Sequence, residues 1–403
     1  MWLCIAVVFA AYLFTPVWWS EIGPDAKDLY AAGVLSAAGG DPYQIAQQGA
    51  EEDRLYNPPG TITRYREIPY GYPPVVTAAL SLGTHVSEPA FYVVSLGLLL
   101  GTGLVGFEFC LSILKWRGRW LARAFFLASA PMALDLFIGN PSALLLLFCG
   151  AGAWLLVSGR PVLGGLVLSG MALKPQVGLP IAVAVIATAP WAAAASNRLR
   201  LWAILAATVG MVAGVAGLAA LGAALEGPAS LGRWSVAARE YGNALGPGAP
   251  GSAFAQTGLA GLPALLMGRF SAPLAAVITA VVVAPAIGFA LWRLRDRIDT
   301  PSFGPMAVGI AVALALSPYL HLNDLVLAAL PLLLIASQRL NPMRRGTLFV
   351  WAVGPYLLLV VLTILSPPGV AGFGQVGIGV VLTGLLLLSA VQAVVAPPPP
   401  GNA

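Results

Sequence analysis

The sequence reads GPDAKDLYAAGVLSAAGGDPY over residues 23–43, inside the one long polar segment of an otherwise apolar chain. This segment runs from Glu21 to Pro74 and holds half of the acidic residues of the protein, interleaved with tyrosines. A membrane protein that gathers its polar side chains in one loop commonly carries out its chemistry there. The segment is therefore the first place to look for a functional site.

The composition predicts a membrane protein. Of the 403 residues, 59% are hydrophobic and only 9% are charged, whereas a soluble domain has about a quarter charged residues. A backbone surrounded by lipid must satisfy its own hydrogen bonds, so the spanning segments must be helices. We expect an all-α, polytopic integral membrane bundle that forms one domain over residues 1–396, with a disordered proline-rich tail at 397–403.

The apolar runs predict about twelve transmembrane helices, and a shorter run at 72–83 is a candidate re-entrant or interfacial segment. We divide the stretch 161–195 at Lys174-Pro175-Gln176, because a lysine and a proline together mark a break. The predicted crossings are 1–19, 90–114, 121–138, 141–158, 161–173, 177–195, 201–224, 271–292, 303–317, 323–337, 346–366 and 375–396.

The distribution of basic residues orients these crossings. With the N-terminus in the cytoplasm, the predicted inner loops hold 13 of the 21 basic residues, as the positive-inside rule requires. These short clusters at the ends of apolar runs are typical topology signals, so the net charge of +5 does not indicate a nucleic-acid partner. The predicted outer segments are the large first loop 20–70, a second loop 225–270, and three short turns at 139–140, 174–176 and 317–324.

Two acids and a lysine on the predicted outer side are candidates for chemistry. Asp25 and Asp28 follow the first helix, and such a carboxylate can act as a general base towards a sugar hydroxyl; the alternative is a helix cap with a solvated face. Lys174 can hold a phosphate by charge; the alternative is a lysine that snorkels from a helix end.

A second pair lies in the turn from Ser317 to Asp324. His321 and Asp324 are three residues apart, which places them on one face if this turn is helical; the alternative is a capped helical hairpin. Asp135 and Glu108 interrupt apolar runs and are expected to face the bundle interior. The three cysteines lie in apolar runs, and the sequence has no metal-binding or nucleotide-binding motif, so we predict no cofactor and leave a divalent metal open.

Taken in order, these pieces resemble glycosyltransferase family 87, the polyprenol-phosphate-mannose-dependent α-mannosyltransferases of bacteria. The family often has aromatic residues where Ala26 and Leu29 stand here, and more often has Gly-Gln where this chain has Gly139-Asn140. The resemblance runs from about residue 20 to 330, and the matching pieces are Asp25, Tyr30 to Gly33, Gly40 to Tyr43, Tyr72 to Pro74, Gly139-Asn140, Lys174 to Gln176 and Ser317 to Asp324.

The resemblance implies a GT-C fold in the bacterial inner membrane, with the active site on the extracytoplasmic side. It implies a sugar donor, probably a mannose, on a polyprenyl phosphate, and a glycolipid or glycan acceptor. Asp25 matches the essential acid of the family and would be the general base of an inverting transfer. Lys174, helped by His321 or Arg66, would stabilise the leaving phosphate, and Asp324 would orient His321. The other implied substrate-binding residues are Asp28, Tyr30, Tyr43, Tyr72, Asn140 and Gln176.

Two other classes of protein compete with this interpretation. A transporter or lipid flippase explains the many crossings, the broken helix at Lys174 and the acids within apolar runs. It does not explain a polar loop of this length so early in the chain, and we see no inverted repeat. An assembly subunit of a cell-envelope complex would predict that Asp25 is dispensable.

Overall fold

The computed structural model describes residues 24–56, 70–114, 119–193, 196–244, 303–317, 320–321 and 323–337, and a few isolated positions between 281 and 389. All the elements within these ranges are helices. Several predictions lie outside the described residues, namely the first helix at 1–19, the crossings at 271–292 and 346–366, most of the last crossing, Arg66 and the tail.

The described helices follow the chain in one series. Their bounds are α3 (Pro24–Ala37), α4 (Ile45–Tyr56), α5 (Pro74–Gly83), α6 (Glu88–Ile113), α7 (Arg119–Leu127), α8 (Ala130–Ile138), α9 (Ser142–Val157), α10 (Pro161–Leu168), η1 (Ser169–Leu173), α11 (Pro175–Thr188), α12 (Pro190–Ala193), α13 (Asn197–Glu226), α14 (Ala229–Ala244), α17 (Gly304–Leu316), η3 (Asn323–Ala328) and α18 (Ala329–Ser337).

Three helical stretches in the described ranges are long and apolar enough to cross a membrane. They are Glu88–Ile113, Pro175–Ala192 and Arg198–Glu226. Shorter apolar helices accompany them, including α9 and α17. A helix needs about 20 apolar residues to span the hydrocarbon core, so these lengths support a membrane protein, while the number of twelve crossings stays a prediction.

The proline-based division of the chain is confirmed at one place and extended at another. One apolar stretch ends at Leu173 and the next begins at Pro175, as the lysine and proline predicted. The run 121–138 was expected as one crossing, but the structure divides it into α7 and α8. Ser129 occupies the position before α8 and Pro131 its first turn, where proline is tolerated at a helix start but not in a helix interior.

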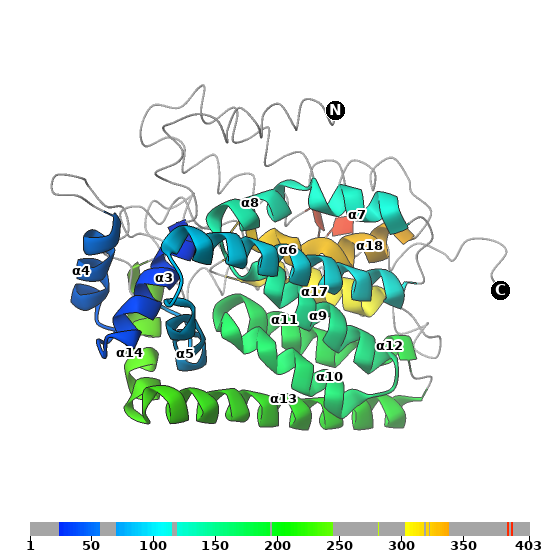
Figure 1. Ribbon diagram of the computed structural model, residues 1–403. Coiled ribbons are helices and arrows are strands. Elements are labelled where there is room, and N and C mark those ends of the chain that lie inside the picture. The colour runs from blue at the N-terminus through cyan, green and yellow to red at the C-terminus, as the bar shows by residue number, and fades with distance from the viewer. Residues whose placement is uncertain are drawn as a thin grey trace.

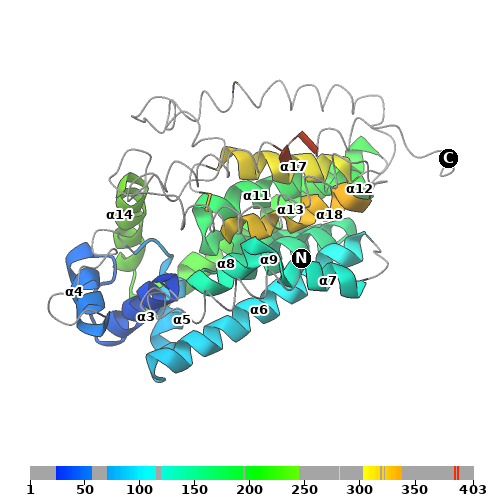
Figure 2. The ribbon, with the colours of Figure 1, turned by 90° about the horizontal axis from the view of Figure 1, so that it is seen from above.

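The polar and basic parts of the chain lie at opposite ends of the bundle. Helices α3, α4, α5 and α14 gather at one end, as Figures 1 and 2 show from two directions. The long helices α6 and α13 run from this end to the other, where the connections α6–α7 and α12–α13 carry basic residues. The two loops predicted on the outer side therefore begin at the same end of the molecule.

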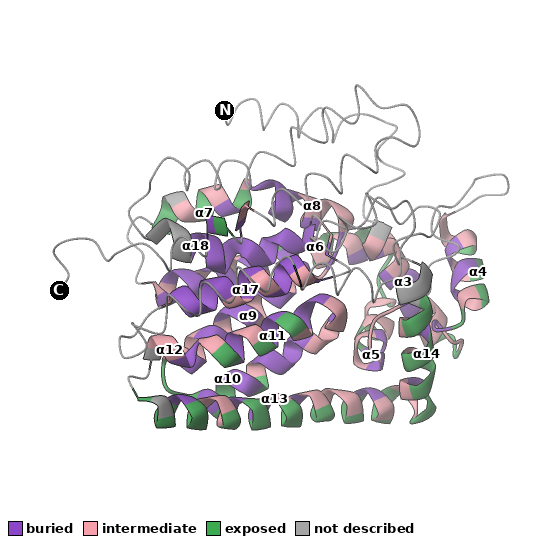
Figure 3. Ribbon diagram, turned by 180° about the vertical axis from the view of Figure 1, so that it is seen from behind, coloured by how far each residue is buried: buried purple, intermediate pink, exposed green. Residues whose placement is uncertain are grey.

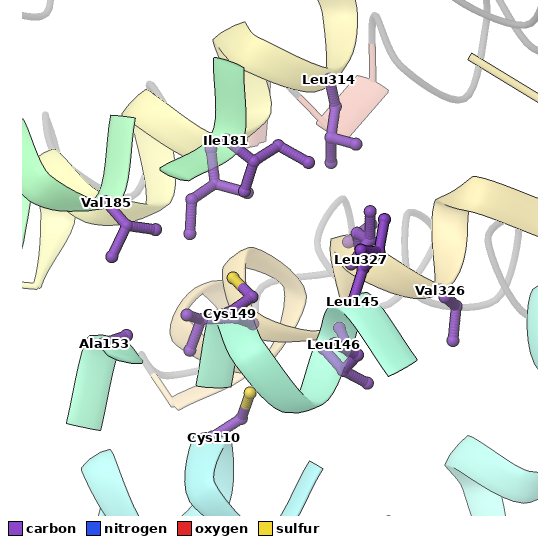
Figure 4. Packing of buried hydrophobic residues seen from close by; sticks show 14 of the residues in the cluster. Cys110, Leu145, Leu146, Cys149, Ala153, Ile181, Val185, Leu314, Val326 and Leu327 are labelled. Atoms are coloured by element: carbon purple, nitrogen blue, oxygen red, sulfur yellow. The ribbon is translucent and has the colours of Figure 1, made fainter. Parts of the chain in front are cut away.

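The core lies around α9, which packs against α6, α10, α11 and η3. In Figure 4, Leu145, Leu146 and Cys149 of α9 lie between Cys110 of α6 and Ile181 of α11. Both of these cysteines are buried free thiols. Figure 3 shows that α17 is largely buried whereas α13 is exposed along much of its length. The exposed apolar side chains of α13 are those expected of a helix that faces lipid.

Glycines allow α10 and α13 to approach closely. A Cβ atom added to Gly165 would lie 1.8 Å from the carbonyl oxygen of Ala207, and one added to Gly210 would lie 2.2 Å from that of Val162. Since these are backbone atoms, the helices themselves would have to move apart. Small residues at such contacts are a common means of packing membrane helices.

We predict that Gly165→Ala destabilises the protein by about 1–3 kcal/mol, the usual cost of overpacking. The control is Gly217→Ala on α13, because a Cβ atom there meets nothing within 4 Å. Thermal unfolding in detergent would measure both variants. Equal melting temperatures for the two variants would contradict the close packing of α10 and α13.

Candidate active site

A network of polar side chains joins four segments that are far apart in the sequence. Nδ2 of Asn140 donates to Oδ2 of Asp25 at 2.5 Å, and Oδ1 of Asn140 accepts from Nζ of Lys174 at 3.0 Å. Lys174 also donates to Oδ1 of Asp324 at 2.6 Å. The structure thus brings together four of the residues predicted for the site.

The first member, Asp25, lies in the first turn of α3. This helix begins at Pro24, as the Gly-Pro-Asp sequence predicted. The first backbone N–H groups of a helix lack partners within it, and its dipole favours a carboxylate there. Asp25 is half-buried, so its carboxylate reaches both the network and the surface.

Asn140 reaches Asp25 because of a tight turn after α8. Gly139 ends this helix with φ 75° and ψ 30°, a left-handed conformation that favours glycine. A Cβ atom on Gly139 would lie 2.6 Å from Cβ of Ala26. The turn therefore packs directly on the start of α3, which places Asn140 beside Asp25.

Lys174 occupies the break between η1 and α11. Its backbone is extended (φ −132°, ψ 77°), and Pro175 begins the next helix. The side chain is only 3% exposed and forms an ion pair with Asp324, which is 0% exposed. The snorkelling alternative is therefore wrong, because a snorkelling lysine keeps its ammonium group in water.

Asp324 joins the network through both of its oxygens. Oδ1 accepts from Lys174 and from Oγ of Ser142, at 2.6 and 2.5 Å, and Oδ2 accepts from the backbone N–H of His321 at 2.9 Å. The ion pair has the hydrogen bonds that a buried carboxylate requires. Asp324 thus fixes the chain before η3 through the backbone of His321, and the printed contact is not to the imidazole.

The electrostatic surroundings of Asp25 suit a group that exchanges a proton. Burial raises the pKa of Asp25 above its ordinary value, against the hydrogen bond from Asn140 and the charges of Lys174 and His321, which lower it; Asp324 adds to the increase. A general base works best when its pKa lies near the operating pH. The pKa of His321 is lowered by burial, which favours a neutral imidazole.

A second buried polar cluster joins α3 to α4. Nε2 of Gln48 donates to Oδ1 of Asp28 at 2.8 Å and to Oε1 of Glu52 at 3.1 Å. Gln48 and Glu52 are 1% and 4% exposed. Asp28, predicted to bind substrate, therefore holds α4 against the helix that carries Asp25.

The two carboxyl groups of this cluster both retain protons more strongly than usual. Burial, and then the charge of Glu52, raise the pKa of Asp28 well above its ordinary value of 3.8. Burial also raises the pKa of Glu52 above 4.5. The folded protein therefore binds more protons here than the unfolded chain does.

We predict that stability falls as the pH rises because of this cluster. The stabilisation is complete below the ordinary pKa values and is lost as the pH rises through the raised values of the folded state. Glu52→Gln should flatten the dependence of melting temperature on pH between mildly acidic and mildly alkaline buffers. Glu51→Gln is the control, because Glu51 pairs with Arg54 at the surface. Parallel curves for wild type and Glu52→Gln would contradict the role of the cluster.

The predicted tyrosines serve mainly in packing. The hydroxyl of Tyr30 donates to the carbonyl oxygen of Val86, at 3.1 Å. The hydroxyl of Tyr43 donates to the carbonyl oxygen of Tyr72, also at 3.1 Å, and lies 3.0 Å from Oγ1 of Thr77. The structure therefore does not bring these three tyrosines into the Asp25 network, and their role as sugar ligands stays a prediction.

Three other sequence predictions can be placed. The carbonyl oxygen of Gln176 lies 3.5 Å from Oγ of Ser317, which links the start of α11 to the end of α17. Asp135 is fully buried as expected, and its Oδ2 accepts from the backbone N–H of Ala143 at 2.8 Å. Glu108 pairs with Arg123, which agrees with the structural role expected for it.

The start of the second predicted outer loop packs on the first. In α14, Arg233 pairs with Asp41 at 3.1 Å, and Nε1 of Trp234 donates to the carbonyl oxygen of Gly71 at 3.1 Å. Just before α14, Glu226 accepts from Oγ of Ser36 at 2.9 Å. These contacts attach α14 to the segment that carries Asp25; the rest of the loop, 245–270, lies outside the described residues.

Sequence reasoning missed Ser142, Gln48 and Glu52. Ser142 stands next to a predicted site residue only through Pro141, and its partner Asp324 is 182 residues away. Gln48 and Glu52 are four residues apart on α4, and this helical spacing was the available signal. Within the described residues no group of three or more histidine, cysteine or acidic side chains is arranged to hold a metal ion.

Comparison with known proteins gives one match. A search of curated proteins and a search of solved structures found nothing similar. The family model of glycosyltransferase family 87 matches residues 70–318, which include Asn140, Lys174 and the start of the turn before His321. This match covers more than half of the chain and does not favour a transporter. Together with the apolar helices, it shows that this membrane protein belongs to glycosyltransferase family 87 and is a glycosyltransferase.

Proposed function

We propose that the protein transfers a hexose, in our view mannose, from a polyprenyl-phosphate donor to a glycolipid or glycan acceptor. The bundle is of the GT-C type in this proposal, and the reaction takes place on the extracytoplasmic side of a bacterial inner membrane. The observation that carries the proposal is the Asp25 carboxylate, which is half-buried at the end of an apolar bundle and joined through Asn140 to a buried ion pair.

Asp25 acts in this proposal as the general base. Asn140 occupies Oδ2, and Oδ1 makes no hydrogen bond that is recorded with the described residues, so Oδ1 can take the proton of an acceptor hydroxyl. The hydroxyl oxygen then forms a bond to the anomeric carbon as the bond from that carbon to the phosphate oxygen breaks. The polyprenyl phosphate leaves with the electron pair, and a single attack opposite the leaving group inverts the anomeric centre.

Lys174 attracts the leaving phosphate by charge. Its Nζ already donates to Asp324 and Asn140, and its third contact, to Oγ of Ser142, is long at 3.5 Å. A phosphate oxygen can replace this weakest contact without breaking the ion pair. A fixed positive charge beside the phosphate stabilises the negative charge that develops there.

A lipid-linked donor is supported by an apolar pocket beside Lys174. The pocket has a volume of about 70 Å³ and lies between α5, η1, α13 and α14. Leu173, the residue before Lys174, lines it together with Val215, Leu218 and Trp234. Apolar side chains next to a cation fit a ligand that has both a hydrocarbon chain and a phosphate.

The donor class can be tested directly. Purified protein in detergent would be supplied with a membrane lipid extract and radiolabelled mannose, carried either by polyprenyl phosphate or by a nucleoside diphosphate. We expect label to reach a lipid or glycan product from the polyprenyl phosphate alone. Transfer from the nucleotide sugar alone would contradict the proposal, as would the absence of transfer from both donors when the lipid extract contains acceptor.

A further inference from the structure

Asn140 lies between two groups of opposite hydrogen-bonding character. The ammonium group of Lys174 can only donate, and an ionised Asp25 carboxylate can only accept. Hence the amide oxygen of Asn140 must face Lys174, at 3.0 Å, and its amide nitrogen must face Asp25, at 2.5 Å. The positive charge of Lys174 thereby dictates that an N–H group points at the proposed base.

Ser142 holds this amide from the other side. Its Oγ lies 2.7 Å from Oδ1 of Asn140 and 2.5 Å from Oδ1 of Asp324. A hydroxyl group has one hydrogen and donates to one of these acceptors at a time. Ser142 is the first residue of α9, and the bond from Ala143 to Asp135 fixes the start of this helix. The turn that carries Asn140 is therefore held by side chains on both α8 and α9.

The substrate role predicted for Asn140 leaves little of the side chain for a sugar. The residue is 3% exposed, and three of its four hydrogen-bonding positions have partners inside the protein. We propose that Asn140 is a positioning residue that orients the Asp25 carboxylate and couples it to Lys174, with Ser142 holding Asn140. This role rests on the proposed function of Asp25 as the base.

The coupling has a measurable consequence for Asp25. The groups that face it are Lys174 at the start of α11, His321 and Asp324 around the start of η3, and Asn140 after α8; Asp28 lies on the same helix, one turn away. The N–H of Asn140 stabilises the ionised carboxylate, so its removal should make Asp25 hold a proton up to higher pH.

The proton occupancy of Asp25 can be read without turnover. Carbodiimides modify protonated carboxyl groups, so labelling of Asp25 across a pH series, followed by peptide mass spectrometry, gives the midpoint of its titration. We expect the midpoint to move to higher pH in Asn140→Ala and by a smaller amount in Ser142→Ala. Ser129→Ala is the matched control, because Ser129 is equally buried but its hydroxyl donates to the carbonyl oxygen of Phe126; its midpoint should equal that of wild type.

Kinetics provide the second readout. In Asn140→Ala we expect kcat to fall about tenfold to a hundredfold, the usual effect of removing a supporting hydrogen bond, while KM for the donor changes less than threefold and the acidic limb of the pH profile moves with the labelling midpoint. Ser142→Thr, which keeps the hydroxyl, should restore most of the activity lost in Ser142→Ala.

Two results would overturn the assignment. One is an unchanged labelling midpoint in both Asn140→Ala and Ser142→Ala. The other is a large rise in donor KM at constant kcat, which would make Asn140 a substrate ligand. If Asn140→Ala does not fold, Ser142→Ala and Ser142→Thr decide the question. A wild-type protein without transfer activity would contradict the proposed function, whereas the labelling midpoints would still decide the role of Asn140.

Discussion

Asp324→Asn is expected to destabilise the folded protein by about 3–5 kcal/mol, the usual cost of leaving a buried charge without its partner. Asp324 is 0% exposed and Lys174 is 3% exposed, and their charged atoms are 2.6 Å apart. The asparagine keeps the shape and one oxygen of the carboxylate but removes its charge. The ammonium group of Lys174 would then be buried and uncompensated. Thermal unfolding of the detergent-solubilised protein measures the loss.

A double variant separates charge from shape. Lys174→Met combined with Asp324→Asn removes both charges and keeps an oxygen for Ser142 and for the backbone of His321. Replacement of a buried ion pair by neutral groups is often neutral or stabilising, so the double variant should recover much of the lost stability. It should not recover transfer activity, because Lys174 is needed for the phosphate. A melting temperature of Asp324→Asn equal to that of wild type would contradict the buried pair.

The elements of the site were largely predictable from local sequence. Gly-Pro-Asp gave the start of α3, and Lys174-Pro175 gave the break before α11, because proline is favoured at the start of a helix and not in its interior. The distribution of polar and basic residues separated the two ends of the bundle. These signals depend only on neighbouring residues and on the membrane, so no tertiary information was required.

The partners within the site could not be predicted in the same way. Lys174 and Asp324 are 150 residues apart, and a single sequence does not show which charges meet. Local spacing favoured a pair between Asp324 and the side chain of His321, three residues earlier. That rule requires both residues in one helix, but η3 begins at Asn323, so Asp324 meets the backbone of His321 instead.

The polar segment also contained more structure than its charge suggested. The run Glu51-Glu52-Asp53-Arg54 is part of α4, and its members have different surroundings. Glu51 and Arg54 pair at the surface, whereas Glu52 is buried towards Asp28. The helical period alone could have separated them once α4 was known, but the apolar pattern of this segment is too weak to define its buried face.

The second large effect is expected at Asp25. Asp25→Asn retains the size of the side chain but cannot accept a proton, and loss of a general base typically costs about a hundredfold to ten-thousandfold in rate. The fold should survive, because the half-buried Asp25 meets the network through one hydrogen bond from Asn140. Asp41→Asn is the matched control, since Asp41 is an acid of the same polar segment that pairs with Arg233.

The most direct test is the transfer of radiolabelled mannose from polyprenyl phosphate to a membrane lipid extract by wild type, Asp25→Asn and Asp41→Asn. All three proteins would first be shown to unfold at similar temperatures. We predict labelled product from wild type and Asp41→Asn and at least a hundredfold less from Asp25→Asn. Equal product from wild type and Asp25→Asn would show that another group is the base and would contradict the assignment of this site.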